Sequence, residues 1–219
     1  MCFSATASFS GAFLIGSIGA FTLRYFSDRR QIFLAMIPFL FAFQQLMEGI
    51  LWMRYPSILA EDSLSYWASR LFLLVAMLWP IWIPLSLWVL EKIPWRRNAL
   101  LLCMGCGVLY GLFFLLEMNL NPSKHMMLTF EKHRIVYLFN LYFPTTLQVL
   151  YGLAALPPAF LSSLKYMWVF GVLCLLGAML AYAFYEVAFV SVWCFFSAWV
   201  SILILFLLRS NFSSGSKHA

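Results

Sequence analysis

The stretch YMWVFGVLCLLGAMLAYAFYEVAFVSVWCFFSAWVSILILFLL, residues 166–208, contains one charged side chain, Glu186, in 43 residues. A transmembrane helix needs about 20 consecutive apolar residues. The stretch is therefore too long for one membrane span and long enough for two. Glu186, which follows Tyr185, marks the expected turn between a span at 166–182 and a span at 187–208.

Further apolar runs precede this stretch, and together they predict seven membrane spans. The earlier runs cover residues 8–23, 32–53, 66–90, 99–116 and 135–156. Every span should be an α-helix, because a helix satisfies its backbone polar groups internally, and the strand-like alternation of an outer-membrane barrel is absent. We predict an all-α polytopic membrane protein, with one transmembrane domain at 1–209 and a flexible cytoplasmic tail at 210–219.

The composition and the distribution of charge give the class and the orientation. The chain has 219 residues, of which 64% are hydrophobic, 19% aromatic and 10% charged. Soluble domains carry about 25% charged residues, so this composition excludes a soluble globular domain, and its hydrophobicity excludes a disordered chain. Nine of the 14 Lys and Arg residues flank the spans on the side of residues 27–31. The positive-inside rule makes that side cytoplasmic.

With seven spans, this orientation places the N-terminus outside and the C-terminus in the cytoplasm. We therefore expect a multi-pass protein of the inner (plasma) membrane, with the lipid bilayer as its first partner. The formal net charge of +6 follows from the topology, so it does not indicate nucleic-acid binding. The sequence defines no oligomeric state.

Glu48 is the clearest polar candidate inside a span. It lies about one turn below the outer end of the span at 32–53. Gln44, Glu48 and Trp52 are spaced i, i+4 and i+8, which places them on one helix face. An ionisable group within the bilayer is costly and is a functional candidate by default. The alternative is a protonated Glu48 that joins neighbouring helices by hydrogen bonding.

Other polar side chains fall at the same outer depth, and they suggest a polar pocket opening toward the periplasmic leaflet. Glu48 would be its central carboxylate and His133 a ligand or a base. The further pocket candidates are Cys2, Ser4, Gln44, Gln45, Trp52, Tyr137, Ser191, Trp193 and Cys194.

Three chemistries fit such a group of residues. A divalent transition metal could be held by Glu48, Glu117, His133 and Glu186, because carboxylate and imidazole are its usual ligands, although no metal-ligand spacing such as H-x-x-x-H is present. A desolvated Glu48 beside His133 could act as general acid or base in a membrane-embedded enzyme. The pocket could also bind a small lipophilic ligand.

Two alternatives compete with a ligand-binding pocket or an enzyme. One is a small transporter or proton-coupled carrier, which would need polar groups on the inner half of the bundle, where they are scarce. The other is a structural or assembly subunit in which Glu48 only joins helices.

Small residues and prolines mark sites of close helix packing. Cys103 and Cys106 have the spacing of a redox motif, but with Gly107 and Gly111 they more often form a close helix contact. Pro80 and Pro84 should bend the span at 66–90, and a proline leaves a backbone carbonyl without its helical partner.

The opening residues Met1-Cys2-Phe3-Ser4-Ala5 resemble the start of an uncharacterised family of bacterial integral membrane proteins. The resemblance extends to the stretches at 44–49 and 191–196, QQLMEG and SVWCFF, and to His133 with Tyr137. It covers most of the chain in order. It implies no activity, but it directs attention to a set of largely outer-side polar residues: Cys2, Ser4, Glu48, His133, Ser191, Trp193 and Cys194.

Overall fold

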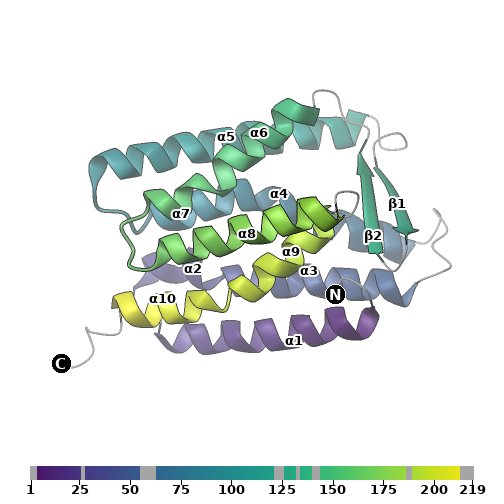
Figure 1. The fold of residues 1–219 in the computed structure, drawn as a ribbon, viewed down its shortest axis with the longest axis horizontal. Coiled ribbons are helices and arrows are strands. Elements are labelled where there is room, and N and C mark those ends of the chain that lie inside the picture. The colour runs from purple at the N-terminus through teal and green to yellow at the C-terminus, as the bar shows by residue number, and fades with distance from the viewer. Residues whose placement is uncertain are drawn as a thin grey trace.

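The structure is a computed structural model, and it describes residues 4–25, 28–54, 63–120, 126–131, 134–139, 144–185 and 189–212. Among these residues, six helical segments are long and apolar enough to cross a membrane. They lie side by side along the long axis of the molecule (Figure 1). The predicted helical membrane-type bundle is thus confirmed, whereas the orientation relative to the cytoplasm stays a prediction.

Four of these six spans are built on one helix each, and the first of them is completed by a short turn. Helix α1 covers Ala5–Thr22 and is followed by the 3-10 turn η1 at Leu23–Tyr25. The next two are α4 at Ser63–Trp88 and α5 at Pro94–Leu120, and the fourth is α8 at Met167–Tyr185. The C-terminal stretch divides as predicted, because α8 ends before Glu186.

Two spans are interrupted helices. The second begins with η2 at Arg29–Gln31 and α2 at Ile32–Ala35, and it continues as α3 at Ile37–Met53. Pro38 at the start of α3 explains the break, because proline cannot donate a helical hydrogen bond. The last span consists of α9 at Phe189–Val200 and α10 at Leu203–Phe212. Helix α10 thus includes the first residues of the predicted tail, while residues 213–219 lie outside the described part.

The predicted helix at 135–156 is wrong in its first part. Residues Arg134–Phe139 form strand β2, which pairs antiparallel with β1 at Met126–Glu131. The helix begins only at Pro144, as α6 at Pro144–Ala155, and α7 at Pro157–Leu161 follows it. The apolar helical segment Thr145–Leu161 is shorter than the six spans.

The error has a physical cause, because strand β2 is buried on both faces. Ile135 and Tyr137 pack with Phe72 of α4 in one cluster, while Val136 packs with Val192 of α9 in another. A strand covered on both sides reads as a continuous apolar run. Periodicity alone cannot separate such a run from a buried helix.

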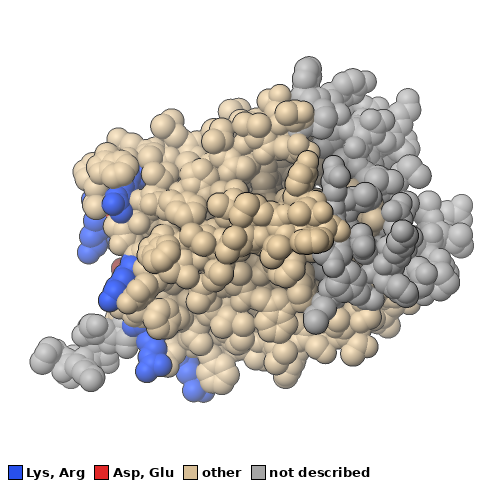
Figure 2. Space-filling view, viewed as in Figure 1, with Lys and Arg blue, Asp and Glu red and all other residues tan. Residues whose placement is uncertain are grey.

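The two ends of the bundle differ in charge. Figure 2 shows Lys and Arg gathered at the end of the molecule where α10 lies in Figure 1, and Figure 1 shows the β-hairpin at the opposite end. We call these the basic end and the hairpin end. The cations that the helix limits place at the basic end are Arg24, Arg29, Arg30, Lys92, Arg96, Arg97, Lys165 and Arg209.

The packing interpretation of the small residues is confirmed at Gly107. Pro84 has no N–H to offer to the carbonyl of Pro80 one turn earlier, and buried Gly107 of α5 packs directly on that carbonyl. A Cβ atom at position 107 would lie 2.5 Å from the Pro80 carbonyl carbon. The thiols of Cys103 and Cys106, on the same helix, are both free.

Candidate functional site

Helices α3 and α9 are joined by two polar contacts one helical turn apart. The Ser191 hydroxyl donates to Glu48 Oε1 at 2.5 Å, and Gln44 Nε2 donates to Cys194 Sγ at 3.8 Å. All four side chains are buried, and Glu48 and Gln44 have no exposed surface. We call Gln44, Glu48, Ser191 and Cys194 the polar ladder. The structure thus brings together four of the residues that the sequence suggested.

Two further residues extend the polar ladder. Trp79 of α4 donates its indole N–H to Gln44 Oε1 at 2.9 Å. Gln45 Nε2 donates to Glu48 Oε2 at 3.3 Å. Both oxygens of the buried Glu48 carboxyl therefore accept hydrogen bonds, which offsets the cost of removing the group from water.

Gln45 also faces helix α1. A Cβ atom at Gly11 would lie 3.7 Å from Gln45 Oε1. Within the described residues, neither Gln45 Oε1 nor the buried hydroxyl of Ser8 has a hydrogen-bond partner. Buried polar atoms are nearly always bonded to protein or to ordered water. The interface of α1 and α3 therefore offers two polar atoms to a water molecule or to a ligand group.

Trp52 of α3 and Tyr137 of β2 belong to one apolar cluster, which joins the hairpin to the helices. The rings of Tyr137 and Phe72 are stacked, with centroids 4.9 Å apart and planes inclined by 3°. Cys194 belongs to the same cluster, together with Met47. The predicted Trp52 and Tyr137 thus share an apolar cluster with a residue of the polar ladder.

Of the remaining predicted residues that the structure describes, Trp193 and Ser4 do not join this group. Trp193 points to α8 and donates its indole N–H to the carbonyl oxygen of Cys174 at 3.1 Å. Ser4 is exposed and caps α1 by accepting a hydrogen bond from Ala7 N at 3.2 Å. Cys2, His133 and Glu186 lie outside the described residues, and of Glu117 only the backbone, in α5, is described. Within the described part of the chain, no three His, Cys, Asp or Glu side chains form a group that could hold a metal ion.

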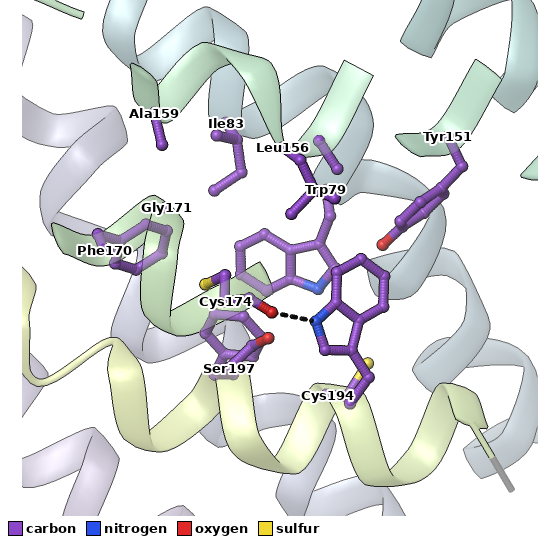
Figure 3. A pocket seen from close by; sticks show the side chains of 13 residues that line it. Trp79, Ile83, Tyr151, Leu156, Ala159, Phe170, Gly171, Cys174, Cys194 and Ser197 are labelled. Carbon is purple, nitrogen blue, oxygen red and sulfur yellow. Dashed lines mark hydrogen bonds between the residues drawn. The ribbon is translucent and has the colours of Figure 1, made fainter. Parts of the chain in front are cut away.

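A cavity of about 40 Å³ lies next to the polar ladder (Figure 3). Trp79 and Cys194 belong both to the ladder network and to the cavity wall. The Tyr151 hydroxyl points toward the Trp79 indole in Figure 3. The rings of Tyr151 and Trp193 have centroids 5.5 Å apart. The lining residues are Phe41, Trp79, Ile83, Tyr151, Ala155, Leu156, Ala159, Phe170, Gly171, Cys174, Trp193, Cys194 and Ser197.

The cavity differs from the predicted pocket, because its wall is largely apolar. The polar side chains of α3 and α9 bond to one another, and the open space lies beside them. Sequence reasoning found Trp193 and Cys194 but missed Trp79, Tyr151 and Cys174. An aromatic or thiol side chain within an apolar helix carries no signal that separates cavity lining from ordinary packing.

Comparison with known proteins gives a family. A family model described as a family of unknown function, DUF6629, matches residues 1–219. The chain belongs to this family. No curated protein and no solved structure matches the chain significantly.

In this member of DUF6629, two stretches that carried the resemblance meet in space. Gln44 and Glu48 come from the first stretch, and Ser191 and Cys194 come from the second. Their contact joins residues 143 positions apart. The family is one of unknown function, so this contact and the cavity beside it are the features that bear on function.

Proposed function

We propose that the protein binds a lipophilic molecule within the membrane, with an apolar end in the cavity and an uncharged polar group toward the polar ladder. The observation that supports this most is the double role of Trp79. Its ring lines the cavity and stacks on Phe41, with centroids 4.0 Å apart, while its N–H is bonded to Gln44. An apolar space with a few convergent polar groups is typical of small-molecule sites.

The size of the cavity limits what can enter it. A cavity of about 150 Å³ holds a benzene molecule, and this one has about 40 Å³. It therefore fits the end of a chain and not a whole ring compound. Tyr151, Leu156 and Trp193 in its wall are partly exposed, so the remainder of a bound molecule would extend past them toward the lipid.

An uncharged polar group suits the ladder better than an ion does. Ser191 and Gln45 already donate to Glu48, and Gln44 already bonds Trp79 and Cys194. A ligand cation or anion would need further counter-charges in a region where burial of charge is expensive. We further propose that the basic end faces the cytoplasm, which places the polar ladder in the outer half of the bilayer.

Photolabelling tests this proposal. The protein is reconstituted in lipid and irradiated with a long-chain alcohol that carries a diazirine at the end of its chain. We expect labelled peptides from α6, α8 and α9, and we expect Ala155→Leu to reduce that labelling by filling the cavity.

The matched control is Ala183→Leu, which makes the same change at an exposed position of α8. It should leave the labelling unchanged. Equal labelling of Ala155→Leu and the wild type, or labels spread evenly over lipid-facing residues, would contradict the proposal.

A further inference from the structure

At the basic end, the buried carboxylate of Glu91 forms hydrogen bonds that join two turns of the chain. Glu91 lies between α4 and α5 and is only 5% exposed. Glu91 Oε1 accepts hydrogen bonds from the backbone N–H groups of Lys92 and Ile93, each at 3.0 Å. Ser163, in the turn before α8, donates its N–H to Oε2 at 2.7 Å and its hydroxyl to Oε1 at 2.9 Å. The turn that carries Lys92 is thereby held against the turn that precedes Lys165.

The C-terminal helix is attached to the same place. Asn211 Oδ1 accepts a hydrogen bond from Lys165 N at 2.9 Å, and Asn211 Nδ2 donates to the Lys165 carbonyl at 3.2 Å. Arg209, half a turn earlier on α10, lies over the ring of Tyr25 at 6.0 Å. Three separate segments thus present their cations on one connected surface.

Two N–H donors on this surface lack an acceptor. The indole N–H of Trp88 and the Nε–H of Arg96 are both buried, and neither has a hydrogen-bond partner among the described residues. The guanidinium of Arg97 lies 4.4 Å above the Trp88 ring. The unpaired Trp88 N–H beside this cation fits an anionic oxygen acceptor, since charge-assisted hydrogen bonds are the strong ones. The Arg96 guanidinium, over the Trp95 ring at 5.2 Å, adds a second cation at the start of α5.

Among the described residues, the eight cations of the basic end outnumber the two carboxylates there, Asp28 and Glu91. Glu91 is occupied by backbone N–H groups and by Ser163. Asp28 accepts a hydrogen bond from the backbone N–H of Arg30. Glu48 belongs to the polar ladder. Figure 2 accordingly shows this end dominated by Lys and Arg.

Exposed aromatic side chains indicate the depth of this surface. Trp95 is 60% exposed and Trp168 is 57% exposed. Both stand near the start of a membrane-type helix at the basic end, at Pro94 and Met167 respectively. Tryptophan at such positions lies at the headgroup level of a bilayer.

We propose that the turn between α4 and α5 binds the phosphate of an anionic phospholipid. Trp88 and Arg96 donate hydrogen bonds to it, Arg97 and Lys92 supply charge, and Lys165 flanks the site. A lipid of the adjoining leaflet is favoured over a soluble phosphate because the site lies at the end of an apolar bundle at headgroup depth. This inference is independent of the ligand proposed for the cavity.

Native mass spectrometry of the detergent-solubilised full chain tests the site, with phosphatidylglycerol and phosphatidylcholine as probes. We expect selective retention of phosphatidylglycerol, weakened by added salt. Replacing one cation near an anionic headgroup weakens binding by about fivefold. Arg96→Gln and Arg97→Gln should each show that loss, and exposed Lys92→Gln should show it without affecting the fold.

Arg54→Gln, at the hairpin end of α3, is the matched control and should leave retention unchanged. Retention that does not change in any of the three basic-end variants would overturn the proposal, and so would equal retention of phosphatidylcholine. Inorganic phosphate distinguishes the source of the anion. If it displaces phosphatidylglycerol at millimolar concentration, the site is one for soluble phosphate and the lipid assignment is wrong.

Discussion

The contact between α4 and α5 predicts that Gly107→Ala is destabilising. The new Cβ atom would lie 2.5 Å from the Pro80 carbonyl carbon and 3.1 Å from Ile81 N, whereas ordinary contacts begin at 3.4 Å. The atoms in the way belong to the backbone, so the two helices must separate by roughly 1 Å. Overpacking of this kind costs about 1–3 kcal/mol, and we expect the upper half of that range because no side chain can rotate away.

Thermal unfolding in detergent measures the effect. For a chain of this size, 1 kcal/mol shifts the Tm by about 2–4 °C, so Gly107→Ala should lower the apparent Tm by about 4–12 °C at a fixed scan rate. Because Trp79 precedes Pro80, the same variant should also reduce photolabelling of the cavity.

Gly105→Ala is the control for Gly107→Ala. It is the same change in the same helix, at an exposed position where an added Cβ meets no atom within 4 Å. Its Tm should equal or exceed that of the wild type, because alanine has the higher helix propensity. The close approach of α4 and α5 is refuted if both variants melt at the same temperature.

Three other perturbations test the polar contacts. Ser191→Ala removes a donor to Glu48 and should lower the free energy of unfolding by about 1–3 kcal/mol, measured by denaturant titration in detergent. Trp79→Phe leaves Gln44 Oε1 without its donor and should cost a similar amount, with reduced cavity labelling. Burial raises the pKa of Glu91, but its hydrogen bonds more than compensate, so the pKa lies below its ordinary value of 4.5. The contribution of Glu91 to stability is therefore complete above pH 4.5 and is lost as the pH falls through the folded-state pKa, which thermal unfolding between pH 6 and pH 3 will show.

Each of these has a matched control. Ser17 is partly exposed and bonds only within α1, so Ser17→Ala should change stability by less than about 0.5 kcal/mol. Trp168→Phe, at an exposed indole, should leave the labelling intact. Glu91→Gln should remove the acid-dependent loss of stability. If it instead melts with the same pH dependence as the wild type, another group is responsible.

The spans were predictable from the sequence because a helix in lipid needs apolar side chains along its whole length. Residues 166–208 must be apolar nearly everywhere, and a single Glu186 is then enough to locate a turn. Strand β2 was not predicted, because both of its faces are buried. Ile135, Val136 and Tyr137 are all apolar and buried, so they show no alternation of polar and apolar residues. Only its pairing with β1, a contact between two segments, defines it as a strand.

The candidate site was predictable in its members and not in its geometry. Glu48 stands out because a carboxyl in an apolar span is rare, and Ser191 and Cys194 stand out by depth. The sequence of neither helix indicates that α3 contacts α9. Ser191 and Glu48 are 143 positions apart, so no short-range sequence pattern connects them. The cavity is harder to predict from the sequence than this contact is. It exists where packed side chains leave a space, and no residue type marks such a place.

The structural and the ligand-binding roles of the polar ladder can be separated. If Glu48 only joins α3 to α9, Ser191→Ala lowers stability, and the protein that remains folded is labelled like the wild type. Ala155→Leu should then leave labelling unchanged, because no ligand would occupy the cavity that Ala155 lines. If the ladder also receives the polar group of a ligand, Ala155→Leu reduces labelling at full stability, and Ser191→Ala reduces labelling beyond its effect on the folded fraction. The two variants therefore give opposite patterns, because one alters only the space and the other alters only the hydrogen bonds beside it.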